Sequence, residues 1–198
     1  MNGDNGDDDH SIEKHALIEP RLWAEEIRRE SGYQDISQSL AERLARAAVP
    51  DERRALHSLL VNEFSMYNNV GEADSALEAY LSEFPVDERA WIQAANIWLN
   101  EPRALPAVEQ AIALAKESSK FLRESYGVKA RIALEMKDNR LLNEAILQMI
   151  ELGPRKDIID IGVESDFVER APEGSIEPEV MEGFRKLYLD YYGRPFAG

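Results

Sequence analysis

Residues 85–119 decide the fold, and they read PVDERAWIQAANIWLNEPRALPAVEQAIALAKESS. Pro85 stops a preceding helix, and Asp87 favours the N-cap of a new one. That helix, expected over 88–100, carries apolar side chains on one face: Trp91, Ala94, Ala95 and Trp98. A second helix is expected to begin near Pro102 and Pro106 and to bury its own apolar face: Ala107, Ala111, Ile112 and Leu114. The stretch therefore predicts one pair of helices.

The same punctuation predicts helices on both sides of this pair. Before it, proline, glycine and asparagine divide the chain into expected helices over 20–30, 36–49, 51–67 and 72–84. After it, one helix is expected over 120–136 and another from about 140 to 152, with Asp138 and Asn139 in the turn between them, and a last helix opens at Pro178. No stretch alternates apolar and polar residues with a period of two, so no sheet is expected. These patterns predict an all-α fold.

The junctions between helix pairs recur at a nearly constant spacing. Pro50 and Pro85 lie 35 residues apart, and Pro154 lies 69 residues beyond Pro85. Two periods of 34 and 35 residues place the intervening junction at Ser119, where one expected helix ends and another begins. Such spacing is typical of helical repeat proteins, in which each pair buries its apolar face against the next pair.

A helix pair that recurs every 34 residues resembles the tetratricopeptide repeat family. In residues 85–119, the apolar positions of both helices fall where that family keeps its aromatic, bulky and small residues. The preceding pair carries further matches: Leu60, Phe64, Ala73, Leu77, Tyr80 and Pro85. The following pair matches more loosely: Tyr126, Ala130, Ala133, Ile146, Met149 and Pro154. The resemblance implies a right-handed α-solenoid of tandem helix pairs with a C-terminal capping helix.

The chain is expected to divide into three parts. Residues 1–15 are acidic and hold few apolar side chains, which predicts a disordered tail. Residues 16–154 would form the repeat domain, with about three clear units and one degenerate N-terminal unit. Residues 155–198 would cap the same domain, because the last helix carries an amphipathic set of apolar residues: Val180, Phe184, Leu187 and Tyr191.

The formal net charge of −15, from 38 acidic and 23 basic residues, bears on the class of partner. Such a surface repels phosphate backbones and anionic membranes, and it would attract a basic protein. The simpler interpretation is that the charge only keeps the chain soluble. The acidic N-terminus, the absence of cysteine and the absence of a long apolar run lead us to expect a cytoplasmic protein.

No motif in the sequence predicts catalysis. Nucleophile elbows, zinc-protease motifs, phosphate loops and calcium loops are all missing from the sequence. The histidines are His10, His15 and His57, and their surroundings predict no metal site. The large aromatic residues at repeat positions are expected to pack in the core rather than to hold a cofactor. We therefore expect no enzyme activity, no metal and no cofactor.

Candidate partner-binding residues follow from the resemblance, because the first helix of each pair lines the concave face in that family. The polar residues at those positions are Asn62, Arg89, Gln93, Asn96, Asn100, Lys129 and Arg131. Asn62 and Asn96 lie 34 residues apart, where many members keep an asparagine that bonds a bound peptide. An asparagine amide suits that task because it both donates and accepts. Exposed asparagines without a function and ordinary surface ion pairs stay as the alternatives.

The expected function is that of a protein-binding module or adaptor that takes a peptide or helix of a partner in this groove. A second interpretation is a dedicated chaperone, or a neutralising partner of a basic secreted or toxic protein, because small acidic repeat proteins suit that task. An enzyme ranks below both. The sequence names neither the partner nor the oligomeric state.

Overall fold

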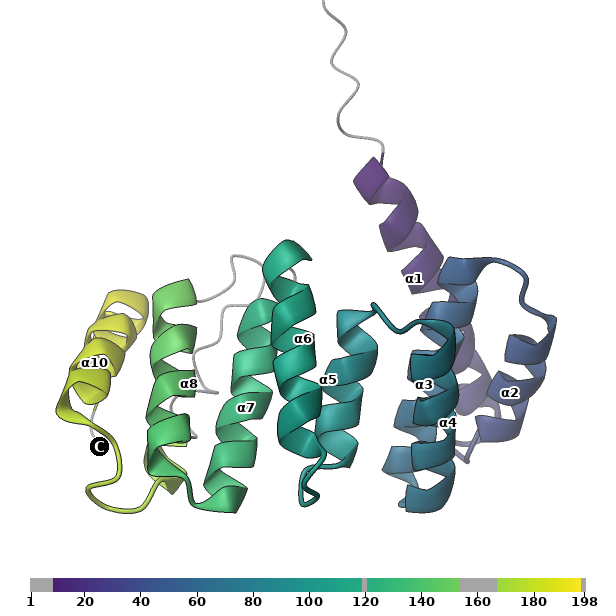
Figure 1. The fold of residues 1–198 in the computed structure, drawn as a ribbon. Helices are drawn as coiled ribbons and strands as arrows, with labels where there is room; N and C mark the ends of the chain where they lie inside the picture. The colour runs from purple at the N-terminus through teal and green to yellow at the C-terminus, as the bar shows by residue number, and fades with distance from the viewer. Residues whose placement is uncertain (1–8, 119–120, 154–166, 197–198) are drawn as a thin grey trace, which may run out of the picture. The chain divides into compact units, whose positions relative to one another are not determined.

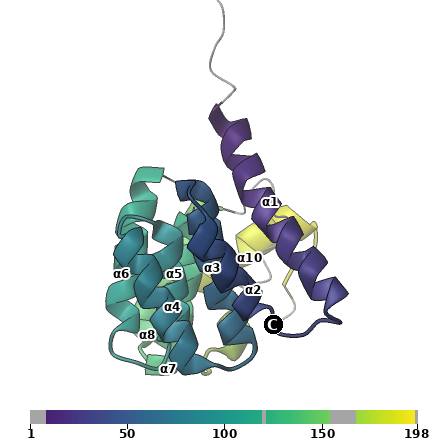
Figure 2. The same ribbon diagram turned by 90° about the vertical axis from the view of Figure 1, so that its right-hand side faces the viewer.

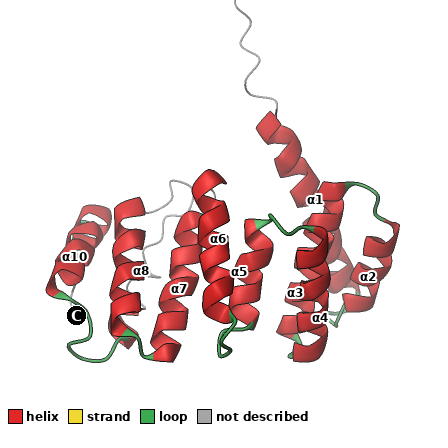
Figure 3. Ribbon diagram, viewed as in Figure 1, coloured by secondary structure: helices red, strands yellow, loops and turns green. Residues whose placement is uncertain are grey.

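A computed structural model describes residues 9–118, 121–153 and 167–196 of the chain. All regular secondary structure in these residues is helical, and they contain no strand (Figure 3). The all-α prediction is confirmed. The described helices pack as neighbouring pairs, and their right-handed solenoid arrangement stays a prediction.

The chain divides into two compact units, residues 1–86 and residues 87–198, and the division falls beside the predicted junction at Pro85. The first unit contains α1 (Asp9–Glu30), α2 (Ser37–Arg46), α3 (Pro50–Met66) and α4 (Val70–Glu83). Helix α3 packs against each of the other three (Figures 1 and 2). The predicted partition into a repeat domain over 16–154 and a cap over 155–198 stays a prediction.

The second unit contains α5 (Glu88–Ile97), α6 (Ala104–Ser118), α7 (Leu122–Met136), α8 (Asn139–Leu152) and α10 (Pro178–Tyr192). Successive helices from α5 to α8 pack on one another, and α5 also contacts α7 directly. Helix α10 lies against α8, as Figure 1 shows. The direct contact between α5 and α7 matters below, because it joins the first helices of two successive pairs.

Capping residues fix several of these boundaries, of which the sequence predicts those at Asp87 and Pro178. The carboxylates of Asp87 and Asp138 accept backbone N–H groups at the starts of α5 and α8, each at 2.9 Å. Proline occupies the first turn of α3 and of α10, where its missing N–H costs little. Gly153, with a φ of 68°, follows the end of α8. The predicted stop at this residue is confirmed.

Helix α1 differs from its predicted form. It begins at Asp9 rather than at Pro20, so Pro20 lies inside the helix and is buried. A proline inside a helix lowers its stability by about 3 kcal/mol. The sequence therefore favours a helix that begins at Pro20. The preceding HALIE segment, residues 15–19, consists largely of helix-favouring residues. Part of the predicted disordered tail is consequently helical, and residues 1–8 lie outside the described residues.

The predicted core positions are largely buried. In the first unit, Tyr80 is completely buried, and a cluster of apolar residues joins α1, α2 and α3: Ala24, Ile36, Leu40, Leu56 and Leu60. In the second unit, Trp98 and Tyr126 are buried. Trp91 and Phe64 are half-buried. The packing interpretation of the buried aromatic residues is confirmed.

Candidate protein-binding site

Helices α5 and α7 bring two of the predicted site residues into direct contact. The Arg131 guanidinium on α7 donates a hydrogen bond to Asn96 Oδ1 on α5, at 2.8 Å. The two residues are 35 positions apart, which is one predicted repeat. Arg131 is exposed and Asn96 is half-buried. Equivalent positions on successive first helices therefore share one face in this unit.

Asn96 uses part of its hydrogen-bonding capacity within the protein. Its Nδ2 donates to the backbone carbonyl of Ile92 one turn earlier, at 3.0 Å, while its Oδ1 accepts from Arg131. A side-chain amide can donate two hydrogen bonds, and its carbonyl oxygen can accept two. These two bonds therefore leave one donor and one acceptor position of the amide. A peptide backbone can bond to both, because it offers one carbonyl and one N–H per residue.

A second contact joins the same two helices near their N-termini. The Arg89 guanidinium in the first turn of α5 lies 5.1 Å from the ring centroid of Phe121, the residue before α7. This geometry suits a cation–π interaction. Gln93 lies on α5 between Arg89 and Asn96 and is half-buried. We call the four residues Arg89, Gln93, Asn96 and Arg131 the α5–α7 face. Asn100 is exposed and lies after the end of α5.

Lys129 does not belong to this face. It is only 4% exposed, and its Nζ contacts Glu109 on α6 at 2.8 Å and Glu144 on α8 at 3.1 Å. Burial alone would lower the pKa of Lys129, but hydrogen bonds to the two carboxylates outweigh burial and raise it. Residues 129 and 131 point in different directions, because two positions on a helix are about 200° apart around its axis. The expectation that Lys129 lines the groove is corrected.

Asn62 belongs to the other unit and is described separately. It lies on α3 and is exposed. Its predicted place on one concave face with Asn96 and Arg131 stays a prediction.

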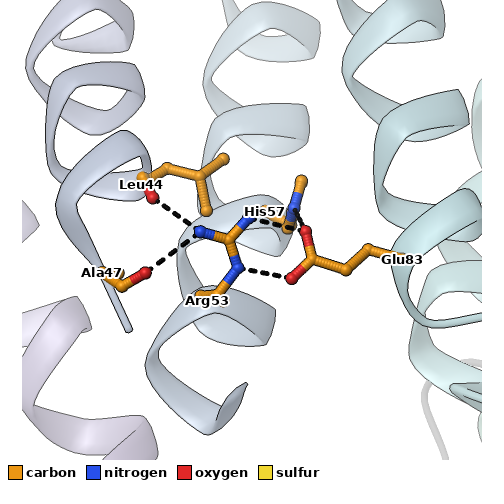
Figure 4. A network of polar contacts seen from close by, with 5 residues as sticks. All are labelled: Leu44, Ala47, Arg53, His57 and Glu83. Atoms are coloured by element: carbon orange, nitrogen blue, oxygen red, sulfur yellow. Dashed lines mark hydrogen bonds and ion pairs between the residues drawn. The ribbon is translucent and has the colours of Figure 1, made fainter. Parts of the chain in front are cut away.

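A polar network in the first unit was not predicted from the sequence (Figure 4). Arg53 on α3 donates to the backbone carbonyls of Leu44 and Ala47 at the end of α2, at 3.0 and 3.1 Å. Its guanidinium also pairs with Glu83 at the end of α4, with one bond of 2.7 Å. The Nε2 atom of His57 lies 3.0 Å from the same carboxylate. The network therefore joins the ends of α2 and α4 through α3.

The chemistry of this network favours a structural role. The hydrogen bond from Arg53 is the main cause that lowers the pKa of Glu83, from 4.5 to about 2, and His57 contributes. A carboxylate with so low a pKa is a weak general base at neutral pH. The His57 ring stacks on Tyr80, with centroids 5.4 Å apart, and is 4% exposed. No spacing rule links residues 53 and 83, so nothing in the sequence predicts this network.

Glu63 is a second polar residue that the sequence did not single out. It is completely buried on α3, where it accepts the backbone N–H of Ile36 at 3.0 Å and pairs with Arg28 of α1. One carboxylate thus accepts a backbone N–H at the start of α2 and pairs with a cation of α1. Glutamate on a helix is usually exposed, and the sequence gives no sign that this one is buried.

Groups of three or more potential metal ligands are absent from the described residues, and none of the described helices is long and apolar enough to cross a membrane. No protein-family model matches the chain, and searches of curated proteins and of solved structures find no match either. The likeness to tetratricopeptide repeats therefore stays a prediction from the sequence.

Proposed function

We propose that this protein is a non-catalytic binding module of the tetratricopeptide type, which binds a peptide or helix of a partner protein along the α5–α7 face. The observation that carries the proposal is the hydrogen bond between Asn96 and Arg131, because it places two polar residues one repeat apart on one face. In a repeat protein such a face extends from one pair to the next.

The chemistry of the face supports an extended peptide as ligand. The amide of Asn96 has the capacity to donate to a peptide carbonyl and to accept from a peptide N–H. Arg131 is exposed and could contact a carboxylate of the same peptide through a charge-assisted bond. Arg89 would add a second cation, half-buried on the same helix as Asn96.

The test begins with the identification of the partner by affinity purification of the full chain. A photo-reactive side chain in place of Asn100 should then cross-link that partner, and one in place of Gln110 on α6 should not. The double variant Asn96→Ala with Arg131→Ala should weaken binding by about tenfold, which corresponds to 1.4 kcal/mol.

A matched control removes one amide and one cation elsewhere in the same unit. Gln110→Ala with Lys116→Ala does so on exposed positions of α6, and it should leave the affinity unchanged. The variant Asn62→Ala with Asn96→Ala, compared with Asn96→Ala alone, tests whether α3 takes part. Equal affinities of the parent and the Asn96/Arg131 variant would refute the α5–α7 face as the binding site.

The second candidate is a dedicated chaperone or neutralising partner of a basic secreted or toxic protein. The net charge of −15 favours it, because a strongly acidic protein attracts a basic client and accelerates the encounter. One stoichiometric basic client in the affinity purification would support this function. Several substoichiometric partners would support the adaptor instead.

A further inference from the structure

Four large apolar side chains are exposed at one end of the first unit. Tyr33 is 70% exposed, Met66 58%, Tyr67 38% and Val70 61%. Single exposed apolar residues are normal on a protein surface, whereas a group of them indicates a contact surface. We call these four residues the terminal patch. They lie outside the α5–α7 face, which belongs to the other unit.

One hydrogen bond joins two residues of the terminal patch, and another closes the turn that connects Met66 with Val70. The Tyr67 hydroxyl donates to the backbone carbonyl of Tyr33 at 2.7 Å, which fastens the turn after α1 to the end of α3. The backbone N–H of Asn69 donates to the carbonyl of Phe64 at 2.9 Å and closes the turn between α3 and α4. This turn brings Val70, the first residue of α4, back beside the last turn of α3.

Tyr33 has a strained backbone. Its φ is 63°, in the left-handed region that glycine favours and that a bulky residue rarely adopts. Its N–H donates to the carbonyl of Arg28 at 2.6 Å, which holds this conformation. Strain of this kind tends to occur at functional sites. Here the strained residue directs its aromatic ring to solvent, where it contributes little to packing.

The charges beside the terminal patch are mainly acidic. Glu30 ends α1, Asp35 follows Tyr33 by two residues, and Glu72 lies in the first turn of α4; all three are exposed. Arg29 is the exposed cation on the neighbouring turn of α1. The local charge beside the patch is therefore negative, like the net charge of −15 of the whole chain.

We propose that the terminal patch is a docking surface for a basic amphipathic segment of a partner protein. The apolar face of such a segment would cover Tyr33, Met66 and Val70, and its lysines or arginines would contact the surrounding carboxylates. A second copy of this chain fits less well, because it would bring like charges together. The proposal is independent of the α5–α7 face.

A synthetic amphipathic helical peptide of leucine and lysine is a suitable probe, with a leucine and glutamate peptide of the same pattern as its control. Fluorescence anisotropy of the labelled peptides with the full chain measures both affinities. The lysine peptide should bind. The variant Met66→Ser with Val70→Ser should lower the affinity for this peptide at least about fivefold, because two apolar contacts are lost. The matched control is Met136→Ser with Val49→Ser, at positions 55% and 56% exposed, and it should not change the affinity.

Two further variants separate the aromatic and the electrostatic contributions. Tyr33→Gly removes the ring and suits the left-handed backbone, so it should weaken binding without lowering the melting temperature. Glu30→Gln with Glu72→Gln should weaken binding and reduce its dependence on salt. Equal loss of affinity in the patch variant and its matched control would overturn the proposal. Equally tight binding of the glutamate peptide, or self-association that the patch variant abolishes, would overturn it as well.

Discussion

Replacement of the buried Glu63 by alanine should destabilise the first unit strongly. The carboxylate is completely buried, and the change removes the acceptor of both Arg28 and the Ile36 N–H. Loss of one partner of a buried ion pair costs about 3–5 kcal/mol. The Arg28 side chain is 23% exposed and can regain some hydration, so we expect the lower end, about 3 kcal/mol. Glu63→Gln keeps an acceptor for Ile36 and should cost about 1–2 kcal/mol.

Urea unfolding of the first unit can be followed through Trp23, which packs against the core of that unit. The chain has three tryptophans, so a Trp91→Phe, Trp98→Phe background leaves Trp23 as the reporter. A loss of about 3 kcal/mol should lower the midpoint by about 1–3 M, given the usual slopes for urea. Far-ultraviolet circular dichroism of the same samples checks that the helical content of the folded variants is unchanged.

The control is Glu42→Ala on α2, which removes an exposed ion pair with Arg46 at 3.9 Å. Such a pair contributes less than about 0.5 kcal/mol, so its midpoint should stay close to that of the parent. A free energy of unfolding for Glu63→Ala that lies within about 1 kcal/mol of the parent value would refute the reasoning. It would mean that water reaches Arg28 and the start of α2, and that the carboxylate is not required there.

Three further predictions concern other residues. Trp98→Ala should cost roughly 3–5 kcal/mol in urea unfolding because it empties a core position, whereas Asn96→Ala should cost less than about 1 kcal/mol; similar losses would contradict the assignment of Asn96 to the surface. Lys129→Met should change the free energy of unfolding by less than about 1 kcal/mol, while Lys129→Ala should cost about 2–3 kcal/mol, because methionine replaces the buried stem; an equal loss for both would mean that the charge itself is required. The pKa of Glu83 is lowered from 4.5 to about 2, so its stabilising contribution is complete above pH 4.5 and is lost as the pH falls towards 2. Melting temperatures across this range should converge for the parent and Glu83→Gln, and a constant difference would exclude the linkage.

Boundaries that depend on local chemistry could be predicted from the sequence. Asp87 caps its helix as expected, and Pro178 opens the last one. Asp138 was expected only as part of a turn, and it also caps a helix. These signals act over a few residues and depend little on the rest of the chain. The start of α1 was predicted wrongly, because Pro20 has the same local preference whether it begins a helix or interrupts one.

Contacts that depend on the packing of separate helices could be predicted only in part. The repeat spacing placed Asn96 and Arg131 on one face, and the structure brings them together. The same spacing could not show that Lys129 turns away from that face towards two glutamates. Burial of Glu63 also escaped prediction, since the residue type alone favours exposure. Which of several charged residues is buried depends on which helix covers it, and that information is not local.

Polar contacts at the repeat spacing occur in both units, and the two contacts differ in how deeply they are buried. In the first unit, Arg28 and Glu63 are 35 residues apart, and the carboxylate is completely buried and serves two helices. In the second unit, Asn96 and Arg131 are also 35 residues apart, but Arg131 is exposed and the amide can still form further bonds. A polar pair enclosed by the fold cannot reach a partner, whereas an exposed pair can. For this reason the proposal of partner binding rests on the α5–α7 face, whereas the contact between α1 and α3 is structural.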